Sequence, residues 1–260
     1  MHCRELFGDD AHEGLLQRAA ALWSLMRGDP RVAHCGTVLS LSDPRGDTAE
    51  ILPGLARLQG LGMCFFLPGS GLEPVMDELR GHGLRVASSP IHRGGAAAHA
   101  ASRTLLAART VPEGLGILRL DAGSPSAPVT ATVELCRSCG LPTMPGEAMR
   151  GGILPGLCLV AIDRAGAPVA TATSCAMHAP VSSRAGNAGG SPGAGLGRQL
   201  GAMAIAEMWQ EQGMRSFRTG VKEGNLASQA ACANLRIERA ELVTAFCFQG
   251  ARLKTGRAGA

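Results

Sequence analysis

The sequence predicts a mixed α/β fold, and three patterns support this. Helical and strand-like segments alternate through the first hundred residues. Further on, two apolar runs, residues 156–163 and 168–175, flank a tight turn as the strands of a β-hairpin do. A glycine-rich stretch, residues 191–198, then leads directly into a helical pattern. Together they indicate a mixed sheet with helices packed on it.

The overall composition is typical of a soluble globular protein. The chain has 260 residues, 45% of them hydrophobic and 18% charged, with a net charge of +4. Its arginines are scattered, and six Phe and two Trp offer little stacking surface for bases. It has no apolar run of the ~20 residues that a membrane span needs and no secretory leader pattern. We therefore expect a cytoplasmic protein with neither a nucleic-acid nor a membrane partner.

Nine cysteines are expected to be mostly buried free thiols, because no export signal accompanies them. Cys136 and Cys139 form the one C-x-x-C pair. It lies inside a helical pattern, with no second pair and no nearby histidine to complete four zinc ligands. No metal site is predicted.

The first half alternates helices and strands. An amphipathic helix over residues 11–27 ends at a Gly-Asp-Pro sequence. The later elements are strand 37–41, a helix from residue 48, the apolar strand 63–67, a helix from residue 72 and strand 84–88. Residues 94–108 are rich in alanine and are expected to connect the two halves, as a loop or a crossing helix.

The second half begins near residue 111. Its expected elements are strand 116–121, helix 128–139, the hairpin, a short or irregular strand within 181–190, a helix to residue 212, strand 216–221, helix 226–235 and strand 240–248. Gly213 is expected to close the first long helix after the glycine stretch, and Asn225 to cap the next one.

The glycine stretch that opens this long helix has the features of an anion site. Glycines fold tightly and let several N–H groups point one way, and a helix start adds free N–H groups and a positive dipole end. A bound phosphate group and a plain turn both agree with this stretch taken alone.

The order of elements from residue 115 onward, with two motifs, resembles the GNAT superfamily of acyl-CoA-dependent N-acetyltransferases. Residues 192–197, Pro-Gly-Ala-Gly-Leu-Gly, match the family's pyrophosphate loop at both glycines. Val221, Asn225, Ala227 and Ser228 match the family's later strand, Asn and short helix at the right distance.

This resemblance implies acetyl-CoA as co-substrate and an amine of a small molecule or peptide as acceptor, attacked directly in a ternary complex. It places the cofactor between the fourth and fifth strands of the GNAT unit, with its pyrophosphate at the loop. The implied cofactor-binding residues are Gly193, Ala194, Gly195, Leu196, Gly197, Arg198 and Asn225.

The sequence also departs from the family pattern. Pro192 replaces the usual first Gln or Arg of the loop, and Cys232 stands where a Tyr commonly protonates the leaving thiolate. Cys232 is therefore a candidate acid, since its thiol would match the leaving thiol in acidity. Because residues 172–197 contain no Asp or Glu, His178 and Glu223 are the candidate bases.

Residues 1–110 resemble the degenerate half of tandem GNAT proteins, with residues 111–260 as the acetyltransferase domain. The first half has no cofactor-type glycine loop, so we expect one cofactor per chain and an acceptor site covered by the first half. The alternative is a catalytically weak CoA-binding or regulatory module. A Rossmann-type enzyme agrees less well, because the loop comes late and after a poor strand. The sequence leaves a homodimer open.

Overall fold

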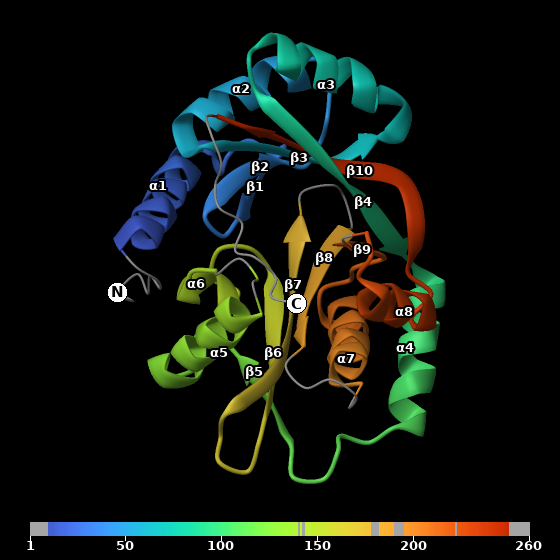
Figure 1. Cartoon of the computed structure of the whole chain (residues 1–260). Helices are drawn as coiled ribbons and strands as arrows, with labels where there is room; N and C mark the ends of the chain where they lie inside the picture. Colours follow the sequence, from blue (N-terminus) through green and yellow to red (C-terminus); the bar gives the residue numbers. More distant parts are fainter. Residues whose placement is uncertain are drawn as a thin grey trace.

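A computed structural model describes residues 10–139, 141, 144–177, 182–189, 195–221 and 223–249, with residues 10–12 and 182–189 as backbone only. Ten strands of this described chain form one continuous mixed sheet, in the order β1-β2-β3-β10-β4-β9-β8-β7-β6-β5. Figure 1 shows the sheet running the length of the molecule, with the strands of the first half at one end.

The strands are β1 Val32–Cys35, β2 Val38–Leu41, β3 Leu61–Pro68, β4 Arg85–Gly94, β5 Gly116–Leu120, β6 Gly156–Ile162, β7 Pro168–Met177, β8 Ser182–Gly189, β9 Ser216–Gly220 and β10 Glu238–Phe248. The α-helices are α1 Asp10–Met26, α2 Thr48–Gln59, α3 Leu72–Gly81, α4 Ala96–Ala108, α5 Ser126–Ser138, α6 Gly146–Met149, α7 Leu196–Glu211 and α8 Leu226–Asn234, with a short 3-10 turn, η1, at Gly69–Gly71.

Strands from the two sides of the predicted boundary pair with each other in one sheet. The C-terminal strand β10 lies between β3 and β4 of the first half and runs antiparallel to both. In turn, β4 pairs antiparallel with β9 of the second half. A division at residue 110 stays a prediction, but the sheet is shared by residues from both sides of it.

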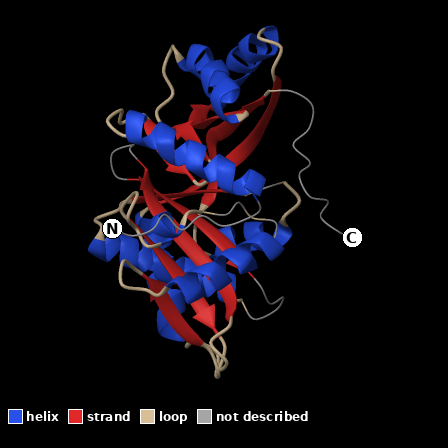
Figure 2. Cartoon of the chain, turned by 90° about the vertical axis from the view of Figure 1, so that its left-hand side faces the viewer, coloured by secondary structure: helices blue, strands red, loops and turns tan. Residues whose placement is uncertain are grey.

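Helices cover the sheet in separate groups, each over its own apolar cluster (Figures 1 and 2). The cluster under α2 and α3 includes Leu52, Leu79 and Cys247. The cluster under α7 includes Leu200, Met208 and Phe217, and α4 joins it through Ala98. A third cluster packs α5 against β6. The apolar periodicity read from the sequence therefore does mark the buried faces.

Most expected elements are present near their predicted positions, including the hairpin of β6 and β7, antiparallel from Gly156 to Ile162. Two expectations need correction: the strand β1 was not predicted, and β8 is a full eight-residue strand and not a short one. Of the two alternatives for residues 94–108, the helix is found, as α4. No helix in the described part of the chain is long and apolar enough to cross a membrane.

Candidate functional site

The start of α7 is an open, glycine-lined helix terminus. Gly195 forms its N-cap in the left-handed region, at φ 65°, where a glycine is at no disadvantage. Within the described residues, no side-chain cap is seen at this N-terminus. Leu196 is buried in the cluster below, which fixes the first turn in place. A Cβ on Gly197 would meet no atom of the described residues within 4 Å, so they leave the outer side of this turn open.

Two arginines flank this terminus. A Cβ built on Gly195 would lie 3.5 Å from Nη1 of Arg109 and 3.7 Å from Nη2 of Arg198. Neither arginine forms an ion pair with a carboxylate of the described residues. Two guanidinium groups and a helix N-terminus therefore combine into one region of positive potential that suits an anion.

Arg198 was predicted from the loop motif, whereas Arg109 was not. Arg109 is the C-cap residue of α4, which packs along α7. The rings of His99 in α4 and Trp209 in α7 stack with centroids 4.5 Å apart. This contact joins the start of α4 to the end of α7. Because the two helices therefore pack antiparallel, the end of α4 lies beside the start of α7. In the sequence, Arg109 is an isolated arginine after an alanine-rich segment, and no motif marks it as part of an anion site.

The strands β8 and β9 separate toward this terminus. They pair in parallel only from Ser182 to Arg184 and from Ser216 to Arg218. Beyond that point β8 remains paired with β7 as far as Gly189, and β9 with β4 as far as Gly220. Because both strands run the same way, they part at the end from which α7 and α8 start.

The helix α8 begins at the same end with the cap that the sequence predicts. Asn225 Oδ1 accepts a hydrogen bond from the Ser228 N–H at 3.1 Å. This confirms Asn225 as an N-cap, and its part in holding a cofactor stays a prediction.

A helix start at the opening of two splayed parallel strands matches a known architecture. No family model and no curated protein matches the sequence. Among solved structures, a tandem GNAT protein from the clavulanic acid biosynthesis pathway has a TM-score of 0.55 and 16% identity, over 81% of this chain and 69% of that one. The present chain has the GNAT fold.

Two further structures agree. A GCN5-related N-acetyltransferase from Kribbella flavida has a TM-score of 0.51 and 15% identity, over 92% of this chain and 97% of that one. A GCN5-related N-acetyltransferase-like protein from Streptococcus suis has a TM-score of 0.50 and 18% identity, over 82% and 78%. The resemblance to the GNAT superfamily is thus confirmed at the level of the fold.

Within this GNAT fold, the candidate catalytic residues have different surroundings. The Cys232 side chain is 7% exposed, in the same cluster as Leu196, and burial raises the pKa of its thiol. Glu223 is 76% exposed, with its carboxylate 3.6 Å from Arg239. His178, Gly193 and Ala194 lie outside the described residues. No hydrogen bond or ion pair between described residues joins Cys232 to Glu223, and the roles of all these candidates stay predictions.

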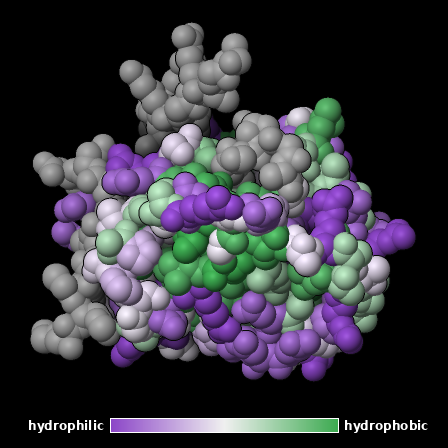
Figure 3. Space-filling view, turned by 90° about the horizontal axis from the view of Figure 1, so that it is seen from below, coloured by the Kyte–Doolittle hydropathy of each residue, from purple (hydrophilic) through white to green (hydrophobic). Residues whose placement is uncertain are grey.

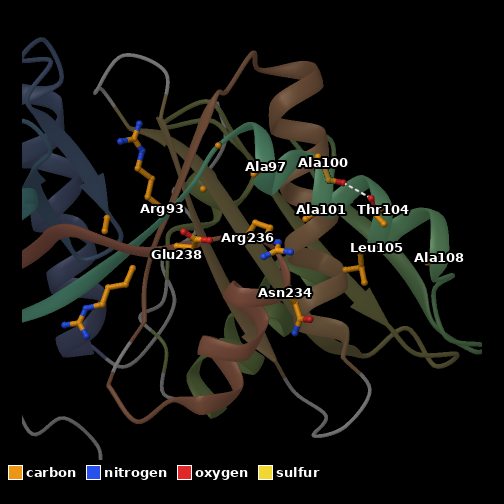
Figure 4. Close-up of a pocket in the computed structure, with 14 residues that line it drawn as sticks. Arg93, Ala97, Ala100, Ala101, Thr104, Leu105, Ala108, Asn234, Arg236 and Glu238 are labelled. Carbon is orange, nitrogen blue, oxygen red and sulfur yellow. Dashed lines mark hydrogen bonds between the residues drawn. The ribbon is translucent and has the colours of Figure 1, made fainter.

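A surface groove of about 1120 Å³ runs beside this region (Figure 4). Alanines of α4, with Thr104 and Leu105, form one wall, and Asn234, Arg236 and Glu238 stand on the opposite side. The wall ends at Ala108, next to Arg109, so the groove leads from the sheet toward the start of α7. Figure 3 views the molecule from below the orientation of Figure 1. On this side, apolar surface at the centre is bordered by hydrophilic residues.

Proposed function

We propose that this chain is an N-acetyltransferase that transfers an acetyl group from acetyl-CoA to an amine of a small molecule or peptide. The observation that supports this best is the start of α7, with its two arginines, at the point toward which β8 and β9 part. The GNAT fold of the neighbouring structures supports the reaction class.

The residues at this terminus fit the pyrophosphate of CoA. The positive end of the helix would face its oxygens, the backbone N–H groups of Leu196 and Arg198 would donate to them, and Arg109 and Arg198 would balance its charge. Gly195 suits a close approach, because it has no side chain and its φ of 65° would strain any residue that has one. Bound acetyl-CoA supplies a thioester carbonyl that an amine can attack directly.

The catalytic assignments belong to the same proposal. Cys232 is the candidate proton donor to the leaving thiolate, because burial keeps its thiol protonated. Glu223 and His178 are the candidate bases, and Asn225 orders the start of α8 beside the cofactor. The first half, residues 1–110, would cover the acceptor side of the second half.

A second function, a CoA-binding module with little turnover, is favoured by one observation. Glu223 is exposed and its carboxylate lies 3.6 Å from Arg239, so this candidate base is already engaged in an ion pair at the surface. CoA binding without acetyl transfer to any amine of a broad panel would favour this second function.

Gly197 offers the sharpest test of the cofactor site. Its Cβ position is open, so Gly197→Ala and Gly197→Glu should both fold. The glutamate places a negative charge where the pyrophosphate is expected, and we expect the Kd for CoA to rise by on the order of 100-fold, about 2.7 kcal/mol. Gly197→Ala should keep an affinity within about threefold of the wild type. Isothermal titration calorimetry measures both, and an unchanged Kd in Gly197→Glu would refute the assignment.

A further inference from the structure

Two arginines stand opposite each other on neighbouring strands, at the point where β8 and β9 part. Arg93 of β4 pairs in register with Arg218 of β9, and Arg218 pairs with residue 184 of β8. Residues directly opposite in an antiparallel pair project from the same face. The side chains of Arg93 and Arg218 are therefore neighbours, and Figure 4 shows Arg93 directed away from α4.

The two side chains are held in fixed positions. Arg93 Nε donates a hydrogen bond to Ser216 Oγ at 3.2 Å, which anchors the exposed side chain to β9. The guanidinium carbon of Arg218 lies 4.1 Å from the centroid of the Phe66 ring. A guanidinium stacked on an aromatic face keeps its N–H edge available for a ligand. The Nε of Arg218 is buried, with no hydrogen-bond partner among the described residues, so its two Nη groups are the ones that can meet a ligand.

An irregular piece of β3 supplies the aromatic ring. Val243 of β10 pairs with Leu67, and Ala245 pairs with Cys64, so two phenylalanines lie opposite one residue. This is a β-bulge, and within it Phe66 has φ 63°, an unusual value for a bulky residue. Bulges redirect side chains, and strained backbone of this kind concentrates at functional sites.

The charge on this pair is not balanced by the described protein. Within the described part of the chain, other arginines do form ion pairs with carboxylates, among them Arg31, Arg45, Arg80, Arg119, Arg164 and Arg239. Neither Arg93 nor Arg218 does so, although Glu238 is the register neighbour of Arg93 on its other side. Burial, and then the charge of Arg93, lowers the pKa of Arg218. Like charges that face each other across strands destabilise a sheet. A bound anion would reduce the repulsion between Arg93 and Arg218.

We propose that Arg218, assisted by Arg93, binds a carboxylate of the acceptor, which is then an amine that also carries a carboxylate, as an amino acid does. The inference rests on the proposed function for the reaction at the amine. The two Nη groups of a guanidinium form a planar fork that matches the two oxygens of a carboxylate. Arg218 is also the last residue of β9 that pairs with β8, so a carboxylate held there leaves its amine near the opening between the strands.

The test uses matched pairs of amines with and without a carboxylate: phenylalanine and phenethylamine, histidine and histamine, lysine and cadaverine. The proteins are the wild type, Arg218→Gln, Arg218→Lys and Arg93→Gln, with exposed Arg103→Gln as the control. Thiol release from acetyl-CoA reports transfer. The shift in melting temperature with each ligand, without CoA, reports binding independently of turnover. CoA affinity shows that each variant is folded.

We expect amino acids to bind and to be better acceptors than their decarboxylated partners. Arg218→Gln should raise the KM or Kd for them at least about 30-fold, as expected on loss of one partner of a charged pair. Arg218→Lys should recover only part of this, because it keeps the charge without the fork. Arg93→Gln should show a smaller rise, and Arg103→Gln none.

The outcomes separate the two proposals. Amino acids that bind through Arg218 without any acetyl transfer would refute the proposed function and support the carboxylate site. Transfer to amines with equal KM in wild type and Arg218→Gln would refute the carboxylate site alone. Stabilisation by inorganic phosphate through Arg218, with none by the amino acids, would also refute it.

Discussion

His34 makes the stability of this protein sensitive to mild acid. Its side chain in β1 is 2% exposed, and neither ring nitrogen has a hydrogen-bond partner among the residues that the structure describes. The ring meets that of Trp23 edge to face, with centroids 5.9 Å apart. Burial in these apolar surroundings lowers the pKa of His34 from its usual 6.5 to about 4.

The direction of the effect follows from proton linkage. Between pH 6.5 and pH 4 the unfolded chain binds a proton at this histidine and the folded chain does not. Stability is therefore full above pH 6.5 and falls as the pH decreases toward 4. Protonation at these two pKa values lowers the free energy of unfolding by about 2 kcal/mol between pH 7 and pH 5, and by about 3 kcal/mol at pH 4.

His34→Leu should remove this pH dependence. Leucine has a similar size, cannot be protonated, and leaves no buried polar atom at the position. Urea unfolding at pH 7 and pH 5 should show the wild type losing about 2 kcal/mol more than the variant. At pH 7 the variant should be at least as stable as the wild type.

Exposed His82, at the end of α3, provides the control. His82→Gln should keep the acid-dependent loss of the wild type. If His34→Leu loses as much stability as the wild type between pH 7 and pH 5, His34 is not the group responsible. Equal m values for the two proteins would show that the comparison concerns stability and not compactness.

Two further predictions concern the candidate site. Arg109→Gln should raise the Kd for CoA about tenfold and reduce the dependence of binding on salt, since it removes one charge from the anion site; Arg103→Gln, on the same helix, should change neither. Cys232→Ala should lower kcat at least about tenfold with little change in the Kd for CoA if the thiol protonates the leaving group, and should cost roughly 1 kcal/mol of stability as a small core deletion. An unchanged kcat would remove Cys232 from the mechanism.

Local features of the sequence predicted much of the fold. The apolar periodicity of α2 and α3 was evident because each helix buries one face, whereas α7 is buried on more than one side, between α4 and the sheet. The β6–β7 hairpin and the Asn225 cap depend on residues close in the chain, so they could be recognised directly. The edge strand β1, only four residues long, was missed because it has little pattern of its own.

The position of β10 in the sheet could not be predicted from its own residues. As a strand of mixed burial it would suit either half of the sheet. Its place between β3 and β4 is decided by pairing with segments far away in the chain. The bulge that turns Phe66 toward Arg218 arises from the same long-range register.

The sequence by itself determined the class of fold, the order of its elements and the glycine-lined start of α7, because these follow from local pattern and backbone chemistry. Tertiary structure alone decided which charged residues lie close together, both at the start of α7 and where β8 and β9 part. Arg109 reaches Gly195 through the packing of α4 on α7, and Arg93 faces Arg218 through the register of β4 and β9. Such meetings depend on helix packing and strand pairing between distant segments, which no local stretch of sequence records.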